Sequence, residues 1–221
     1  MAGTERDRRE QGAVQGADTR RKLIETAVRH FAEQGFEAAS QRAIQRDARV
    51  NPAAAHYHFG SKEALYRAVI DTFIHDVQTA RVRLHAAVPA ELTGSARLHR
   101  LLRDYFEPGF AVATTPHGLH YARILARVQG ERGTPTQFIF TDIARPVRAL
   151  YLDSLRELFP GAAAEAVEEA LLMGVALMSI GAIGSGQGEP SPVASPADAA
   201  EQLATFIAAG IQARFGPAHQ A

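Results

Sequence analysis

The chain has no cysteine among its 221 residues. This absence excludes disulfide bonds, thiol catalysis and cysteine-based zinc sites, and it is compatible with a reducing cytoplasm. The chain also lacks an excess of either charge, because 24 basic side chains balance 24 acidic ones. A net charge of zero, taken over the whole chain, argues against a partner such as nucleic acid.

Segments that would direct the chain to a membrane are missing as well. Residues 1–17 are polar and of mixed charge without an apolar centre, so they do not form a signal peptide. The longest nearly apolar run, residues 170–183, is too short for a membrane span and contains two glycines and a serine. This run is typical of a buried helix. We therefore expect a cytoplasmic protein with no membrane partner.

The region beyond Pro89 has no stretch of alternating apolar and polar residues, the pattern that indicates β-strands. Apolar residues instead recur at helical spacing, and proline or glycine separates the segments. The sequence therefore predicts an all-α fold. We expect helices over residues 18–34, 41–48, 52–59, 62–88, 95–112, 118–129, 135–142, 143–159, 162–184 and 196–215. Asp18 or Thr19 would cap the first of them.

Two of these helices are short and separated by about three residues. Asn51 stands where a helix N-cap is expected, and Pro52 follows at the first helical position, where its missing N–H costs nothing. Gly60 ends the second helix, and Ser61 can cap the next one. This spacing predicts a helix-turn-helix.

The charge is divided unevenly along the chain. Residues 1–67 contain 12 Lys or Arg and 9 acidic residues, a net charge of +3, whereas residues 68–221 contain 12 and 15, a net charge of −3. The positive excess therefore lies on the part that contains the helix-turn-helix, where contact with phosphates would need it.

Residues 19–71 resemble the DNA-binding domain of the TetR family of bacterial transcription regulators. The resemblance begins with Thr19-Arg20 and a helix containing Leu23, Ile24, Ala27 and Phe31, and continues with Gly35-Phe36. Its most specific part is the block Val50-Asn-Pro-Ala-Ala-Ala-His-Tyr-His-Phe-Gly-Ser-Lys-Glu-Ala-Leu65.

The resemblance implies a TetR-like architecture. A disordered tail, residues 1–17, would precede a three-helix DNA-binding domain over residues 18–64; the alternative for the tail is an arm that enters the DNA minor groove. Residues 65–221 would form a larger helical domain for ligand binding and dimerisation. The resemblance implies a non-enzymatic transcriptional regulator, most often a repressor. It would bind a pseudopalindromic operator as a dimer and be released by a small, mostly apolar effector.

Matching positions imply which residues contact DNA. Arg42 is our candidate for direct base reading, because its guanidinium can pair with O6 and N7 of guanine at once. Ala53 and Ala54 would let the second helix lie close to the bases, and Tyr57, His58 and Lys62 would contact phosphates. The full predicted set is Gln41, Arg42, Asn51, Ala53, Ala54, His56, Tyr57, His58 and Lys62.

Two residues depart from the family pattern. Arg49 occupies the turn where the family usually has glycine, so either Arg49 carries the strain of a left-handed backbone or the turn differs. Its guanidinium could also meet a phosphate. His30 replaces a residue that is usually apolar, and we interpret it as partly exposed or hydrogen-bonded, not as a ligand.

A ligand pocket is predicted among large apolar residues on helices that proline and glycine bend. The candidates are Phe106, Phe110, Tyr121, Phe138, Tyr151 and Met178; each taken singly is more often plain core, but together they suggest a mostly apolar cavity. Polar groups near the mouth would be His117, His120, Arg123 and Arg148. The helices of residues 162–184 and 196–215 are the predicted dimer interface, with Gly174 and Gly181 allowing close approach; a central helix of a monomeric bundle is the alternative.

Two other classes of function remain as rivals. An enzyme or metalloprotein has little support, because the pairs His56/His58 and His117/His120 lack carboxylates at metal-ligand spacing; we expect no metal and no cofactor. The glycine spacing of residues 184–188 is similar to that of a nucleotide-binding loop, but the sequence predicts no strand before it and no helix directly after it. A helical scaffold would explain the bundle but not the block from Tyr57 to Lys62.

Overall fold

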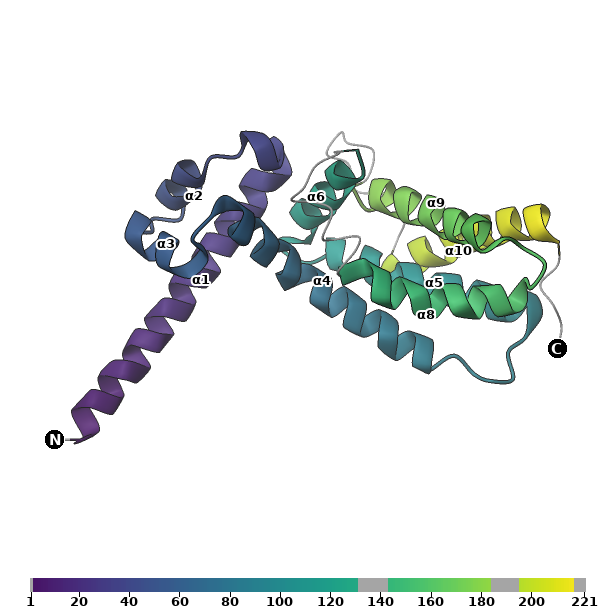
Figure 1. Cartoon of the computed structure of the whole chain (residues 1–221), viewed down its shortest axis with the longest axis horizontal. Coiled ribbons are helices and arrows are strands. Elements are labelled where there is room, and N and C mark those ends of the chain that lie inside the picture. The colour runs from purple at the N-terminus through teal and green to yellow at the C-terminus, as the bar shows by residue number, and fades with distance from the viewer. Residues whose placement is uncertain (1, 131–142, 184–194, 217–221) are drawn as a thin grey trace. The chain divides into compact units, whose positions relative to one another are not determined.

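The structure is a computed structural model that describes the backbone of residues 2–130, 143–183 and 195–216, and the side chains of 14–128, 143–181 and 195–216. All regular structure in these ranges is helical (Figure 1). The helices are α1 (Ala2–Ala38), α2 (Gln41–Asp47), α3 (Pro52–Phe59), α4 (Lys62–Ala86), α5 (Gly94–Ala113), α6 (Gly118–Gly130), α8 (Arg145–Leu158), α9 (Ala164–Ile183) and α10 (Pro196–Phe215). The predicted all-α fold is thus confirmed. The expected helix over residues 135–142 lies outside the described residues.

The chain divides into two compact units, Met1–Thr72 and Phe73–Ala221. Unit 1 contains α1, α2, α3 and the first turns of α4. Its core includes the predicted apolar face of α1, and Tyr66 of α4 packs edge-on against Phe31 and Phe36, with ring centroids 4.9 and 5.1 Å away. Because Tyr66 belongs to this core, the compact unit extends past residue 64 to Thr72.

The first helix begins earlier than the sequence predicted. We expected Asp18 or Thr19 to cap a helix after a disordered tail, but α1 starts at Ala2. Asp18 instead pairs with Arg21 and Lys22, at 2.6 and 2.7 Å, and the Thr19 hydroxyl donates to the carbonyl of Gln15. These are contacts within a continuous helix. The prediction was wrong because an acid before a basic pair is equally suited to a cap and to pairs one turn apart.

The end of the first helical segment was predicted well. Gly35 has φ 76° and ψ 171°, so helical geometry breaks one residue after the expected end at residue 34. Glycine is suited to this position, because a side chain disfavours a positive φ. The short continuation to Ala38 brings Phe36 back into the core, where it is 6% exposed.

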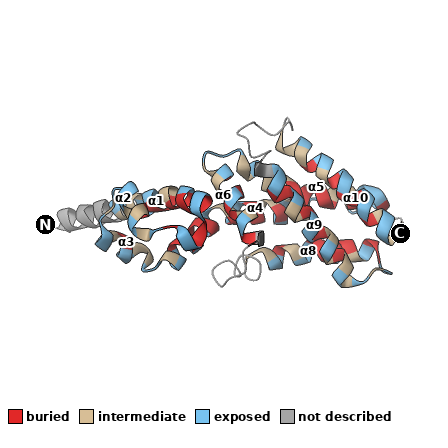
Figure 2. Cartoon of the chain, turned by 90° about the horizontal axis from the view of Figure 1, so that it is seen from above, coloured by how far each residue is buried: buried red, intermediate tan, exposed pale blue. Residues whose placement is uncertain are grey.

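Unit 2 is a helical bundle whose buried face is shown in red in Figure 2. Its core is built from leucines, aromatic residues and small residues of α5, α8, α9 and α10. Helix α5 contains Pro108 without ending there, as the sequence suggested. Gly174 of α9 faces Phe106, because a Cβ at Gly174 would overlap the ring edge of Phe106. This glycine therefore serves packing within the chain, whereas the sequence reading assigned it to a partner helix.

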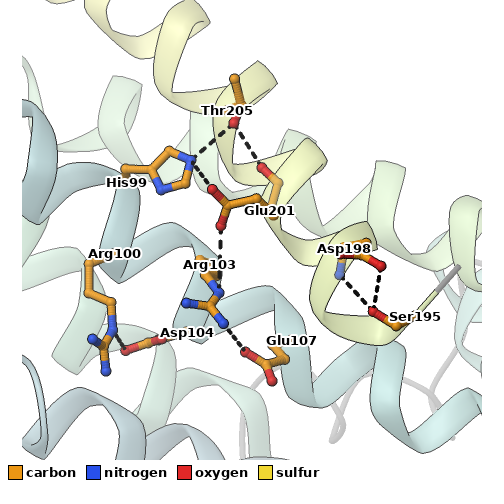
Figure 3. A network of polar contacts seen from close by, with 9 residues as sticks. All are labelled: His99, Arg100, Arg103, Asp104, Glu107, Ser195, Asp198, Glu201 and Thr205. Carbon is orange, nitrogen blue, oxygen red and sulfur yellow. Dashed lines mark hydrogen bonds and ion pairs between the residues drawn. The ribbon is translucent and has the colours of Figure 1, made fainter. Parts of the chain in front are cut away.

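Helices α5 and α10 pack closely and add polar contacts at their exposed margin (Figure 3). His99 of α5 lies 3.0 Å from the Thr205 hydroxyl and 3.6 Å from the Glu201 carboxylate of α10. Arg103 reaches the same carboxylate at 3.6 Å. Ser195 caps α10 by accepting a hydrogen bond from the backbone N–H of Asp198. These contacts fix the position of α10 along α5.

Candidate nucleic-acid interface

Caps on both short helices of unit 1 define where they begin. The Ser40 hydroxyl accepts from the backbone N–H of Ala43 at 3.4 Å, and α2 starts between them. The Asn51 side chain accepts from Ala53 N–H at 2.8 Å, and Pro52 occupies the first turn of α3. Both helices therefore have a fixed start, as the sequence predicted for Asn51 and Pro52.

The turn between α2 and α3 depends on Arg49. Its φ is +54°, the only positive φ at a non-glycine residue in the described part of the chain. Arg49 thus takes the left-handed conformation that the turn requires, which answers the question left open by the sequence: the turn is kept and the arginine bears its strain. Its side chain is exposed.

His30 and Asp47 hold α2 against α1 from behind. His30 is 5% exposed, and its Nε2 lies 2.9 Å from Asp47 Oδ2. The Gln34 amide nitrogen lies 3.2 Å from His30 Nδ1, so Nδ1 accepts and Nε2–H donates to Asp47. This hydrogen bond, helped by Arg46, lowers the pKa of the Asp47 carboxyl below its ordinary value. The expectation of a hydrogen-bonded histidine is confirmed.

Most of the predicted DNA contacts lie on the surface of α2 and α3. Tyr57 is 85% exposed, an unusual setting for so large an aromatic side chain. Exposed with it are Arg42, Asn51, Ala53 and His56, while Gln41, Ala54 and His58 are half-buried. Ala55, by contrast, is 2% exposed and packs inward. Unit 1 therefore presents side chains from both short helices to the outside, and their contact with DNA stays a prediction.

Lys62 is placed differently from the rest of the predicted set. Its Nζ donates to the carbonyls of Phe36, Glu37 and Ala39 at 2.9, 3.1 and 3.4 Å. It also lies 4.5 Å from the centroid of the Phe36 ring. Three acceptors use all three hydrogens of the ammonium, so in this structure Lys62 binds the end of α1 to the start of α4.

A separate cavity lies within unit 2, between α4, α5, α6, α8 and α9, with about 770 Å³ of empty space that includes its open mouth. Of the predicted pocket residues, Tyr121 and Met178 line it. Arg148, predicted at the mouth, lines it too, but His117, His120 and Arg123 do not. Phe106, Phe110 and Tyr151 lie outside its lining, and Phe138 lies outside the described residues.

Tyr151 shows why an aromatic residue predicted for the pocket belongs to the core. It is 1% exposed, and its hydroxyl donates to the backbone carbonyl of Arg81 at 2.8 Å. Burial raises the pKa of this phenol above its ordinary value. Its ring packs edge-on against Tyr105 and His85, so Tyr151 joins α8 to α4 and α5.

Sequence reasoning missed the polar residues of the cavity. Gln78 and Arg81 of α4 line it and are 8% and 5% exposed. A signal was available, because Ile74, Val77 and Arg81 fall on one helical stripe. A charged residue on an otherwise apolar stripe is the mark of a buried polar site.

An exposed apolar surface is formed by α9 and α10. Met173, Leu177, Ile180 and Phe206 are 53%, 43%, 64% and 67% exposed. Three of them, with Gly210, line a shallow groove between the two helices. We call these four side chains the α9–α10 face. Side chains of this size rarely gather at a surface that faces only water.

The residues that the structure describes contain no group of three or more histidine, cysteine or acidic side chains arranged to hold a metal ion. In the same part of the chain, no helix has the length and apolar character needed to span a membrane.

An outward-facing pair of capped short helices on a three-helix core, joined to a larger helical bundle, defines a helix-turn-helix DNA-binding protein. Residues 23–69 match the family model described as bacterial regulatory proteins, tetR family, and residues 103–210 match the model described as tetracyclin repressor-like, C-terminal domain. The chain belongs to the TetR family, and it is a non-enzymatic transcriptional regulator that binds DNA.

Individual relatives agree with this assignment. The chain is 32% identical over 151 residues to the HTH-type transcriptional regulator BetI of Rhizobium meliloti, covering 68% of this chain and 70% of the relative. It is 34% identical over 125 residues to the HTH-type transcriptional regulator UidR of Escherichia coli, covering 55% and 62%. A TetR-family regulator from Bordetella parapertussis shares the fold, with a TM-score of 0.62 at 19% identity over 85% of this chain and 93% of that one.

Proposed function

We propose that the chain is a dimeric repressor that binds a pseudopalindromic operator in the bacterial cytoplasm and leaves it when a small, mostly apolar molecule enters the cavity of unit 2. The outward face of α2 and α3 is the observation that supports DNA binding in this proposal. There Arg42 and Tyr57 are exposed although the helices beneath them are capped and fixed. Rigid support of an exposed polar face is what base reading requires.

In the proposed complex, different residues do different work. Arg42 pairs with guanine in the major groove, and Gln41 and Asn51 add contacts at the base edges. His56, Tyr57 and His58 contact phosphates, and these contacts fix the position of unit 1, the DNA-reading head, without reading the sequence. The methyl groups of Ala53 and Ala54 let α3 approach the bases closely but read little beyond thymine methyls.

Lys62 acts indirectly in this proposal. Its ammonium is already bonded to three carbonyls at the end of α1. We therefore propose that Lys62 holds the start of α4 against the end of α1. This role replaces the phosphate contact that the resemblance suggested. Arg49, exposed at the turn, is the better placed cation for a phosphate.

The α9–α10 face supports the dimer. In a twofold dimer, Met173, Leu177, Ile180 and Phe206 of one subunit would be buried against the same face of the other subunit. Such a pair carries two reading heads, and a pseudopalindromic operator offers two equivalent half-sites. Dimerisation would thus bury the exposed apolar residues and pair the two reading heads.

Coupling between effector and DNA would run through α4. This one helix supplies Leu65 and Tyr66 to the core of unit 1, and Val77 and Arg81 to the wall of the cavity. An occupant that binds one position of α4 better than another shifts the population towards it. Release follows if the favoured position no longer matches the half-site spacing.

A gel shift with DNA fragments taken from beside the chain's own coding region tests the proposal. We expect one fragment to be retarded, and its affinity to fall steeply between about 50 and 200 mM salt because phosphate contacts release counterions. A fragment that binds identically to unrelated DNA would contradict operator recognition, and a flat salt dependence would contradict contact through phosphates. The bound fragment then serves to screen for compounds that release it.

A further inference from the structure

Among the residues that the structure describes, the cavity of unit 2 has a mostly apolar wall and one cation without an ion pair. Its described lining includes Val77 of α4, Val112 of α5, Leu125 of α6, and Val175 and Met178 of α9. No aspartate or glutamate belongs to that lining, whereas two arginines do, Arg81 and Arg148.

The two arginines differ in how their charge is compensated. Arg148 lies 3.4 Å from the carboxylate of Glu168. Arg81 forms no ion pair with any residue that the structure describes, although it is 5% exposed. The buried acid of neighbouring α5, Asp104, is bound by Arg100 at 2.6 Å. Arg81 therefore carries the uncompensated charge of the cavity.

The position of the Arg81 guanidinium is fixed by neutral groups. Its Nε donates to the carbonyl of Tyr105 at 2.8 Å, its Nη1 donates to Gln78 Oε1 at 3.4 Å, and its carbon lies 4.1 Å from the centroid of the Tyr105 ring. These contacts orient the group but do not neutralise it. A buried arginine cannot lose its proton, so it needs an anion to offset the cost of burial.

Gln78 provides a second buried hydrogen-bond donor beside the Arg81 guanidinium. Because its Oε1 accepts from Arg81, its amide nitrogen faces the remaining direction, and this nitrogen is buried without a hydrogen-bond partner in the described structure. An unpaired buried N–H group costs free energy that an acceptor would recover. Gln78 and Arg81, one turn apart on α4, thus present donors to one cavity whose described lining contains no acidic side chain.

We propose that the effector is a small amphipathic carboxylate. Its carboxylate accepts hydrogen bonds from Arg81 and Gln78, and its apolar body lies against Val77, Leu125 and Met178. A carboxylate fits better than a phosphate, because one guanidinium and one amide match two oxygens and a single negative charge, whereas a phosphate needs more donors. This proposal rests on the proposed function in one respect: it takes this cavity as the effector site.

Direct binding to the full-length protein without DNA tests the proposal. Calorimetry would compare two matched pairs of probes, octanoate with octanol and phenylbutyrate with phenylbutanol. Each carboxylate should bind about tenfold more tightly than its alcohol, as expected for charge-assisted hydrogen bonds in a buried site. Arg81→Met should abolish this preference while leaving the alcohols unaffected, and Gln78→Leu should reduce it by about threefold.

Two further variants complete the design. Arg81→Lys keeps the charge and should retain part of the preference even if Arg81→Met fails to fold. Arg83→Met removes an exposed arginine of the same helix and should change nothing. Equal affinity for carboxylate and alcohol in the unchanged protein, or no binding of any probe, would overturn the proposal. So would an unchanged preference in both Arg81→Met and Gln78→Leu. Because no DNA is present, failure here is distinct from failure of the gel shift.

Discussion

At the scale of single residues, Arg49 is the one non-glycine residue of the described chain with a positive φ, +54°, in the turn between α2 and α3. Arg49→Gly should raise the free energy of unfolding by about 1 kcal/mol, because glycine takes the left-handed conformation without steric cost. Thermal unfolding followed by circular dichroism measures the change. Arg46→Gly, in the regular part of α2, is the matched control and should lower stability by about 1 kcal/mol. A destabilised Arg49→Gly variant would mean that the arginine side chain stabilises the turn.

The His30–Asp47 hydrogen bond predicts how stability depends on pH. The bond lowers the pKa of Asp47 in the folded state, so its contribution is present above the pKa of the unfolded chain, about 4, and is lost as the pH falls through the folded-state value. Asp47→Asn should therefore be less stable near neutral pH and should lose less stability on acidification. Melting temperatures measured from neutral pH to below about pH 3 test this. Asp71→Asn, an exposed site of α4, should follow the unchanged protein; parallel curves for all three proteins would contradict the role of Asp47.

At the scale of elements, Gly174 determines how closely α9 packs on α5. A Cβ at this position would overlap the Phe106 ring, whereas a Cβ at Gly181 would lie 3.4 Å from Phe110. Gly174→Ala should therefore destabilise the fold by about 1–3 kcal/mol through overpacking. Gly181→Ala should be neutral or slightly stabilising because alanine is the better helix former. Chemical denaturation compares the two; equal effects would show that Gly174 is not the point of close approach.

Local signals predicted the elements of the head well. Asn51-Pro52 and Gly60 define the ends of α3 in the structure as they did in the sequence, because caps and breakers act within a few residues. The start of α1 was missed, since Asp18 pairs along the helix instead of capping it.

The candidate ligand site was harder to predict. Phe106 and Tyr151 were expected in the pocket but fill the core, and Gln78 and Arg81 were overlooked. Periodicity shows which face of a helix is buried, but whether that face meets another helix or a cavity depends on packing between distant segments. Tyr121 and Met178 line the cavity because of how distant helices pack, which the sequence alone does not show.

At the scale of the whole molecule, the α9–α10 face predicts the oligomeric state. Phe206→Glu places a charge in the middle of the proposed interface, where burial without a partner is costly. Light scattering should find a dimer for the unchanged protein and a monomer for the variant, and operator affinity should fall with dimerisation. Phe206→Leu keeps the apolar contact and should remain dimeric. A dimeric Phe206→Glu variant would exclude this face as the interface.

If the exposed face of α2 and α3 reads DNA, Arg42→Ala should weaken binding to the operator and leave the fold intact. The measurement is the dissociation constant for the operator fragment by fluorescence anisotropy, with Arg83→Ala as a control for loss of one positive charge elsewhere. We expect operator binding to weaken by about 1–3 kcal/mol, the preference among bases to relax at one position, and the melting temperature to stay unchanged. Unchanged operator affinity together with unchanged sequence preference would contradict DNA reading by this face.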